Sequence, residues 1–156
     1  MGRSMRIVFM GFSIFIFMMG YAMAEEKGVV TYENNVKPII AKGCLSCHGS
    51  SAPTIEQFDQ NKEGFKKQSK GPRMDTYQNL MVFVNGKDTG AFMRRLDDGK
   101  NTKDSKPGNM YTWLGKTDEE RAKNLEIIRK WVGGWTLKRK AEITEEELKT
   151  IKAKEK

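Results

Sequence analysis

Several features are scarce or missing in this 156-residue chain. It has two cysteines, Cys44 and Cys47, and one histidine, His48, so a site that needs two histidines or two Cys/His pairs is excluded. There is little strand signal and no internal repeat, which argues against a sheet or a repeat architecture. The 28 Lys and Arg residues are mixed with 20 Asp and Glu and form no dense basic run. Nucleic acid is therefore not an expected partner.

The one long apolar run lies at the N-terminus. Arg3 and Arg6 form a short basic head, residues 7–21 are mostly apolar, and Ala-Met-Ala at 22–24 precedes the first acids. This is the layout of a secretory signal peptide, and the run is short for a membrane span, which needs about 20 apolar residues. We expect residues 1–24 to be cleaved and the protein to be exported, into a periplasm if the source is bacterial. An uncleaved signal would instead keep the protein at the membrane.

Removal of this segment changes what remains for function. The two arginines leave with no acidic residue, so the formal net charge falls from +8 to +6, and six of the ten methionines are lost. The remaining positive charges are spread along the chain, which predicts a solvated surface and favours steering towards an acidic partner. Four methionines stay in the mature chain: Met74, Met81, Met93 and Met110.

Apolar residues at helical spacing predict several short helices. They cover residues 31–42, 74–84, 91–96 and 118–132, and a last helix starts at Thr144. Pro38 predicts a short or kinked first helix. Thr117 with Glu120, and Thr144 with Glu147, have the spacing of capping boxes, and Gly133-Gly134 ends the longest helix.

Polar loops join these helices, over residues 49–53, 60–73 and 97–109. Asp97 and Asp98 precede Gly99, which predicts a turn. The whole is an all-α chain with long loops, and it has too little regular structure for its length unless a non-protein group fills the core. We divide it into the signal at 1–24, a domain at 25–135 and a charged helical extension at 136–156.

The sequence CLSCH, residues 44–48, allows three interpretations. A redox pair of the thioredoxin type needs a preceding strand, whereas a helix is predicted here, and a disulfide across this spacing closes a very small loop. A zinc site wants four ligands, or three with an open position, and the adjacent Cys47 and His48 are poorly placed to share one ion. The third interpretation is covalent haem attachment, for which C-x-x-C-H is the signature.

The haem interpretation fits the rest of the chain best. Two thiols on one turn, Cys44 and Cys47, can add to the two vinyl groups at one edge of a porphyrin, and His48 then faces the iron. Three observations agree with this interpretation: the predicted export, the presence of both cysteines in the motif, and a sole histidine directly after the second cysteine. One haem c would also supply the missing core.

The ligand on the other face of the iron must be something other than histidine. Met74, Met81 and Met93 fall on apolar faces of predicted helices, where core packing is the ordinary role. Met110 lies in the loop Pro-Gly-Asn-Met, with no helical face to fill, so it is the preferred candidate. Water, another side chain or an open position are the alternatives, and the choice matters because His/Met ligation suits electron transfer and an open site suits ligand binding.

At this point the chain resembles monohaem class I c-type cytochromes. The run YENNVKPIIAKGCLSCHG is similar to the opening of such domains and NMYTWLGKTDEERAKNLEIIRKWVGGW to their close. The resemblance implies a small helical domain around one haem, thioethers at Cys44 and Cys47, His48 as proximal ligand and Met110 as distal ligand. Residues 50–109 and the tail after Trp135 have no match in that plan.

The resemblance implies a soluble electron carrier that docks transiently with redox partner proteins, such as acidic or membrane-bound ones. No residue is then expected to act as a catalytic acid or base. Two other interpretations stay open. One is a ligand-binding or peroxidase-like protein with an open sixth position, and the other is a haem c subunit of a larger oxidoreductase. The sequence predicts no oligomeric state.

Overall fold

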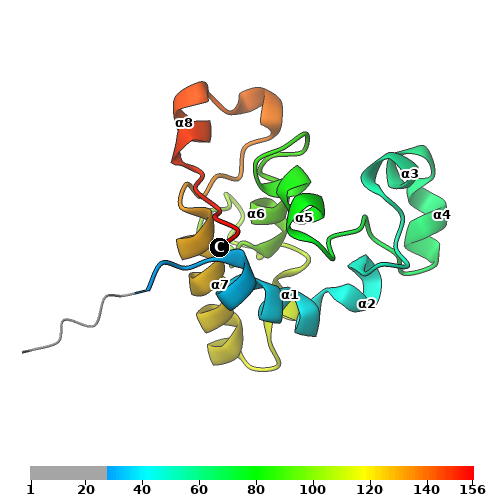
Figure 1. Cartoon of the computed structure of the whole chain (residues 1–156), viewed down its shortest axis with the longest axis horizontal. Helices are drawn as coiled ribbons and strands as arrows, with labels where there is room; N and C mark the ends of the chain where they lie inside the picture. The colour runs from blue at the N-terminus through cyan, green and yellow to red at the C-terminus, as the bar shows by residue number, and fades with distance from the viewer. Residues whose placement is uncertain (1–27) are drawn as a thin grey trace, which may run out of the picture.

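The computed structural model describes residues 28–156, so the signal peptide predicted at 1–24 lies outside the described residues. The elements in chain order are η1 (Tyr32–Val36), α1 (Lys37–Gly43), α2 (Leu45–His48), α3 (Ile55–Gln60), α4 (Lys62–Lys67), α5 (Tyr77–Val84), α6 (Ala91–Leu96), η2 (Tyr111–Leu114), α7 (Asp118–Val132), η3 (Lys140–Glu142) and α8 (Glu145–Thr150) (Figure 1). Apart from one isolated bridge between Gly133 and Ile151, residues 28–156 contain no β-structure. The all-α prediction is confirmed.

The first helix forms in two parts and leads into the CLSCH motif. The extended Thr31 begins it, and its hydroxyl accepts the N–H of Asn34 at 3.3 Å. A π-helical turn, η1, then continues into α1, and Pro38 lies just after the junction of the two parts. The N–H of Cys44 bonds to the carbonyl of Ile40 at 2.9 Å, so the motif continues directly from α1.

The longest helix, α7, has the bounds that its sequence predicts. The Thr117 hydroxyl accepts the N–H of Glu120 at 3.2 Å, which is half of the predicted capping box. The other half is absent, because the Glu120 carboxylate accepts the N–H of Lys116 at 2.8 Å instead. Gly133, with φ +77°, ends the helix in a conformation that favours glycine.

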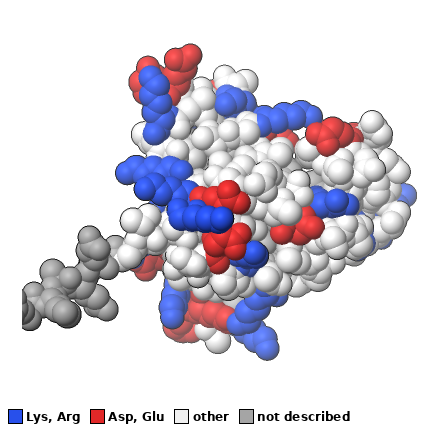
Figure 2. All heavy atoms as spheres, in the orientation of Figure 1, with Lys and Arg blue, Asp and Glu red and all other residues white. Residues whose placement is uncertain are grey.

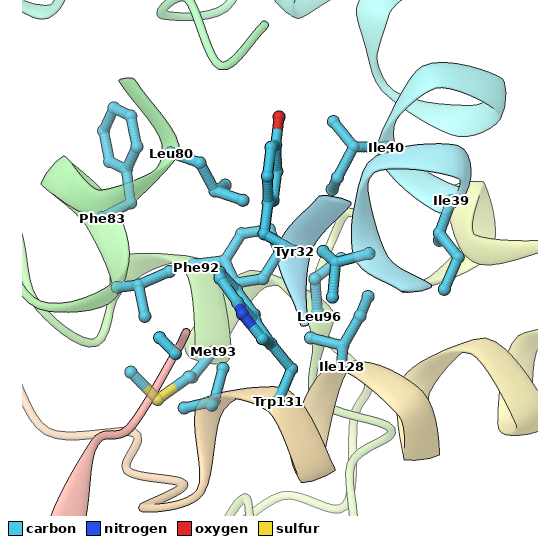
Figure 3. Packing of buried hydrophobic residues seen from close by; sticks show 14 of the residues in the cluster. Tyr32, Ile39, Ile40, Leu80, Phe83, Phe92, Met93, Leu96, Ile128 and Trp131 are labelled. Atoms are coloured by element: carbon cyan, nitrogen blue, oxygen red, sulfur yellow. The ribbon is translucent and has the colours of Figure 1, made fainter. Parts of the chain in front are cut away.

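The hydrophobic core lies where η1 and α1 meet α5, α6 and α7. The ring of Tyr32 is 6.2 Å from that of Trp131 and 5.6 Å from that of Tyr77, and Figure 3 shows Met93 and Ile128 beside this cluster. The fully buried apolar side chains include Val36, Ile40, Leu80, Val84, Met93, Ile128, Trp131 and Val132. The chain therefore has a protein core of its own beside the CLSCH motif.

The extension predicted at 136–156 turns back onto this core. The capping box of Thr144 and Glu147 starts α8 as predicted. After α8 the carbonyl of Lys154 accepts both the N–H of Tyr32, at 2.9 Å, and the indole N–H of Trp131, at 2.8 Å. Ile151 and Ala153 are buried, so the C-terminal segment covers the core beside η1 (Figure 1).

One predicted loop was wrong. Residues 62–67 form α4, because the Asn61 side chain accepts the N–H of Gly64 at 3.1 Å and the rings of Phe58 and Phe65 stack at 6.2 Å. Helices α3 and α4 contain no buried residue and stand apart from the α5–α7 body (Figure 1). Within residues 28–156, no helix combines the length and the apolar character that a membrane crossing requires.

Candidate functional site

The two thiols of the motif lie on one short helical segment. Cys44 joins α1 to α2, Cys47 lies in α2, and both are half-buried and not joined by a disulfide. Burial raises the pKa of Cys44 to about 11, and the neighbouring Cys47 adds to the rise. Redox-active cysteines have lowered pKa values instead, so this environment does not favour a thiol switch.

His48 is buried and its ring is fixed by one hydrogen bond. Its Nδ1 lies 2.6 Å from the carbonyl oxygen of Pro72. A carbonyl oxygen accepts only, so Nδ1 must carry the proton and Nε2 keeps its lone pair, as in histidines that bind metals. In the part of the chain that the structure describes, the bond from Nδ1 is the one hydrogen bond of the ring, and Nε2 makes none.

The electrostatics around His48 favour the neutral ring. Burial lowers its pKa most, the bond to Pro72 opposes that effect, and the charge of Arg95 lowers the pKa further, with a net decrease. A neutral imidazole is the form that binds a metal. The residues therefore present one imidazole nitrogen that is deprotonated, oriented and free to bind.

A second segment holds the imidazole in place. Gly71 donates its N–H to the carbonyl of Cys47 at 3.0 Å, and Met74 donates to the carbonyl of His48 at 2.8 Å. A Cβ on Gly71 would lie 2.0 Å from Cε1 of the ring, so only glycine permits this approach. Sequence reasoning missed Gly71 and Pro72, and their one signal was a Gly-Pro pair inside an expected loop.

Met110, the predicted distal ligand, lies in a different segment of the chain, directly before η2. It is half-buried and packs against the core. Its N–H donates to the carbonyl of Arg95 at 2.9 Å, and Arg95 is also the charge that lowers the pKa of His48. Arg95 is thus a common neighbour of the two predicted axial ligands.

The other methionines of the described residues also pack against the core. Met93 is fully buried, and its sulfur accepts the N–H of Thr136 at 3.3 Å. Met74 and Met81 are half-buried against the core. Met74, which precedes α5, and Met110 both lie outside the helices, and neither sulfur has a hydrogen-bond partner within residues 28–156. Met74 follows the segment that holds His48 and donates its N–H to the His48 carbonyl, so Met110 stays the predicted distal ligand.

The residues around the motif fit a large apolar group. The motif offers two thiols and an imidazole that is already oriented by a hydrogen bond. Among the described residues, no three or more His, Cys, Asp or Glu side chains come together to hold a bare metal ion. Several apolar side chains of the adjoining segments stay only half-buried: Leu45, Ile55, Met74, Met81, Met110 and Tyr111. A covalently attached haem would cover apolar surface of this kind.

Comparisons with known proteins agree with this chemistry. A model of the PccH cytochrome c family matches residues 31–155. A solved structure described as monoheme cytochrome PccH from Geobacter sulfurreducens is 48% identical, with a TM-score of 0.76, over 81% of this chain and 99% of that one. No curated protein matches the chain. The resemblance to monohaem c-type cytochromes is confirmed, as is one covalent haem c as the cofactor. The chain belongs to the PccH cytochrome c family.

Proposed function

We propose that this protein is an exported electron carrier, in which Cys44 and Cys47 form the haem thioethers and His48 and Met110 bind the iron. The family supports the broader statement that it is an electron-transfer haem protein. The observation that carries the proposal is the hydrogen bond between Nδ1 of His48 and the carbonyl of Pro72, which leaves Nε2 for the iron. When bound, haem c supplies one-electron chemistry without making or breaking covalent bonds in a substrate.

The proximal side depends on a rigid imidazole. The bond to Pro72 fixes the tautomer, and Gly71 packs against the ring. A ligand held in this way need not reorient when the oxidation state changes, which keeps the transfer barrier low. Outer contacts of this kind also raise the basicity of a ligating histidine.

The place of Met110 outside the helices and the contrast with Met93 support the distal assignment. The sulfur of Met93 is occupied by the N–H of Thr136, whereas the backbone of Met110 is fixed to α6 through Arg95 and its side chain is half-buried. His/Met ligation raises the haem potential and suits electron transfer. No residue of the site is then required as an acid or a base.

We infer the exported location and the kind of redox partner from the N-terminal sequence and the distribution of charge. The N-terminus has the layout of a signal peptide, and the formal net charge that would remain after its removal is +6. In Figure 2, Lys and Arg are interspersed with Asp and Glu on the face in view, which suits brief, reversible docking with an acidic or membrane-bound partner rather than permanent assembly.

Visible absorption of the oxidised protein tests the ligand assignment. The wild type is expected to be low-spin and to have the weak red charge-transfer band of a methionine-ligated ferric haem. Met110→Ala should lose that band, whereas Met81→Ala, a matched methionine control, should keep it. A band that persists in Met110→Ala would reject Met110 as the ligand.

A further inference from the structure

Asp97 is a fully buried carboxylate outside the haem motif, at the end of α6. Its Oδ1 accepts the backbone N–H groups of Gly99, at 2.9 Å, and Asn101, at 3.4 Å. Its Oδ2 accepts the Asn101 side-chain amide at 2.8 Å, the indole N–H of Trp135 at 2.9 Å and the guanidinium of Arg129 at 3.1 Å. A buried carboxylate is costly unless it is paired and hydrogen-bonded, and this one is bonded from three segments.

The cluster ties α6 to the C-terminal half of α7. Arg129 lies on α7 and also donates to Asp98 at 2.9 Å. Its guanidinium carbon lies 5.0 Å from the ring centroid of Trp135, within the range of a cation–π contact. The end of α6 is thereby held by charge and by hydrogen bonds against the longest helix of the core.

The segment that carries Met110 is attached to the same end of α6. Gly108 donates its N–H to the backbone carbonyl of Asp97 at 2.8 Å, and Met110 donates to the carbonyl of Arg95 at 2.9 Å. The Asn109 side chain accepts a bond from Arg95 at 3.1 Å. A Cβ on Gly108 would lie 2.3 Å from the Arg95 carbonyl oxygen, so this segment lies flat against the last turn of α6.

We propose that Asp97, with Arg129 and Trp135, forms a positioning cluster that keeps the Met110 thioether on the haem iron. This inference rests on the proposed function, because it requires Met110 to be the distal ligand. A methionine side chain has three rotatable bonds, so its occupancy of the iron depends on how firmly its backbone is held. The cluster fixes the end of α6, and the end of α6 fixes residues 108–110.

Competition by imidazole measures this positioning directly. Imidazole binds ferric haem when the methionine has left, so its apparent affinity reports the fraction of protein with the ligand detached. Asp97→Asn keeps the shape of the side chain and removes its charge. We expect it to bind imidazole at least about tenfold more tightly than the wild type, since charge-assisted bonds to Arg129 and Trp135 are weakened.

A matched variant separates positioning from general charge effects. Asp104→Asn makes the same change on the exposed part of the same loop and should bind imidazole as the wild type does. The free energy of unfolding is measured for each variant by circular dichroism. An imidazole affinity that is unchanged in Asp97→Asn, even where unfolding becomes easier, would show a merely structural role and overturn the inference.

A second variant covers the case in which Asp97→Asn does not fold. Trp135→Phe removes one donor to Asp97 and keeps an aromatic ring near Arg129. It should also bind imidazole more tightly than the wild type, and wild-type affinity would overturn the inference. If the red band is missing from the wild type or survives in Met110→Ala, the proposed function fails first and takes this inference with it.

Discussion

Replacement of Gly71 by alanine is the sharpest test of how the chain holds its imidazole. The added Cβ would lie 2.0 Å from Cε1, 2.5 Å from Nδ1 and 2.7 Å from Nε2 of His48. Ordinary carbon contacts are about 3.5–4.0 Å, so the ring cannot stay where it is. The ring has little freedom to move away, because its Nδ1 is bonded to Pro72 and its backbone to Met74.

The magnitude follows from the size of the overlap. Forcing a methyl group into a packed site costs about 1–3 kcal/mol, and breaking the bond to Pro72 would add about 1 kcal/mol. We expect Gly71→Ala to lower the free energy of unfolding by about 2–4 kcal/mol. For a chain of this size, that corresponds to a fall in Tm of about 4–16 °C.

The assay is thermal unfolding of the haem-loaded protein, together with its ferric spectrum. Gly28→Ala is the matched control, because a Cβ there would meet nothing within 4 Å. The control should unfold at the wild-type temperature, whereas Gly71→Ala should unfold earlier and show a perturbed ferric spectrum. Wild-type stability and spectrum in Gly71→Ala would refute the close contact between Gly71 and the imidazole.

Three further predictions concern the frame around the site. Thr144→Ala removes the N-cap of α8 and should cost about 1 kcal/mol in chemical unfolding; an unchanged midpoint would contradict a folded α8. Trp131→Phe loses the indole bond to Lys154 and should cost about 1 kcal/mol, and equal stability would mean that the tail does not dock. Burial raises the pKa of Asp97, but the hydrogen bonds donated to it outweigh burial and lower its pKa from 3.8. Its stabilisation is therefore present above about pH 4 and lost as the pH falls through the lowered pKa. Below about pH 4, the free energy of unfolding should fall less steeply with decreasing pH in Asp97→Asn than in the wild type. The same pH dependence in both proteins would contradict a lowered pKa of Asp97.

Helices with local signals could be predicted closely. The bounds of α6 and α7 agree with the sequence, because both helices have apolar residues at helical spacing. Helix α7 also has a capping threonine, Thr117, and a terminal glycine, Gly133, directly beside it. The helix predicted at 74–84 starts at Tyr77, since the Thr76 hydroxyl caps it by accepting the N–H of Asn79 at 3.1 Å. Helix α4 was missed because its sequence is polar and it buries no residue.

The site could be predicted only where its residues are adjacent. CLSCH places two thiols and an imidazole within five positions, so its chemistry is local. The partner of His48 is Pro72, which is 24 residues away, and no periodicity connects the two. The turn predicted at Asp97 exists, with Gly99 at φ +89°, yet the contact with Arg129 depends on how α6 meets α7.

Addition of carbon monoxide to the reduced protein at neutral pH tests the central claim most directly. The account requires both axial positions of the iron to be filled by the chain, from His48 and Met110. It predicts a visible spectrum that does not change when carbon monoxide is added. Rapid formation of a carbon monoxide complex by the wild type would contradict the account and favour a ligand-binding site with an open sixth position.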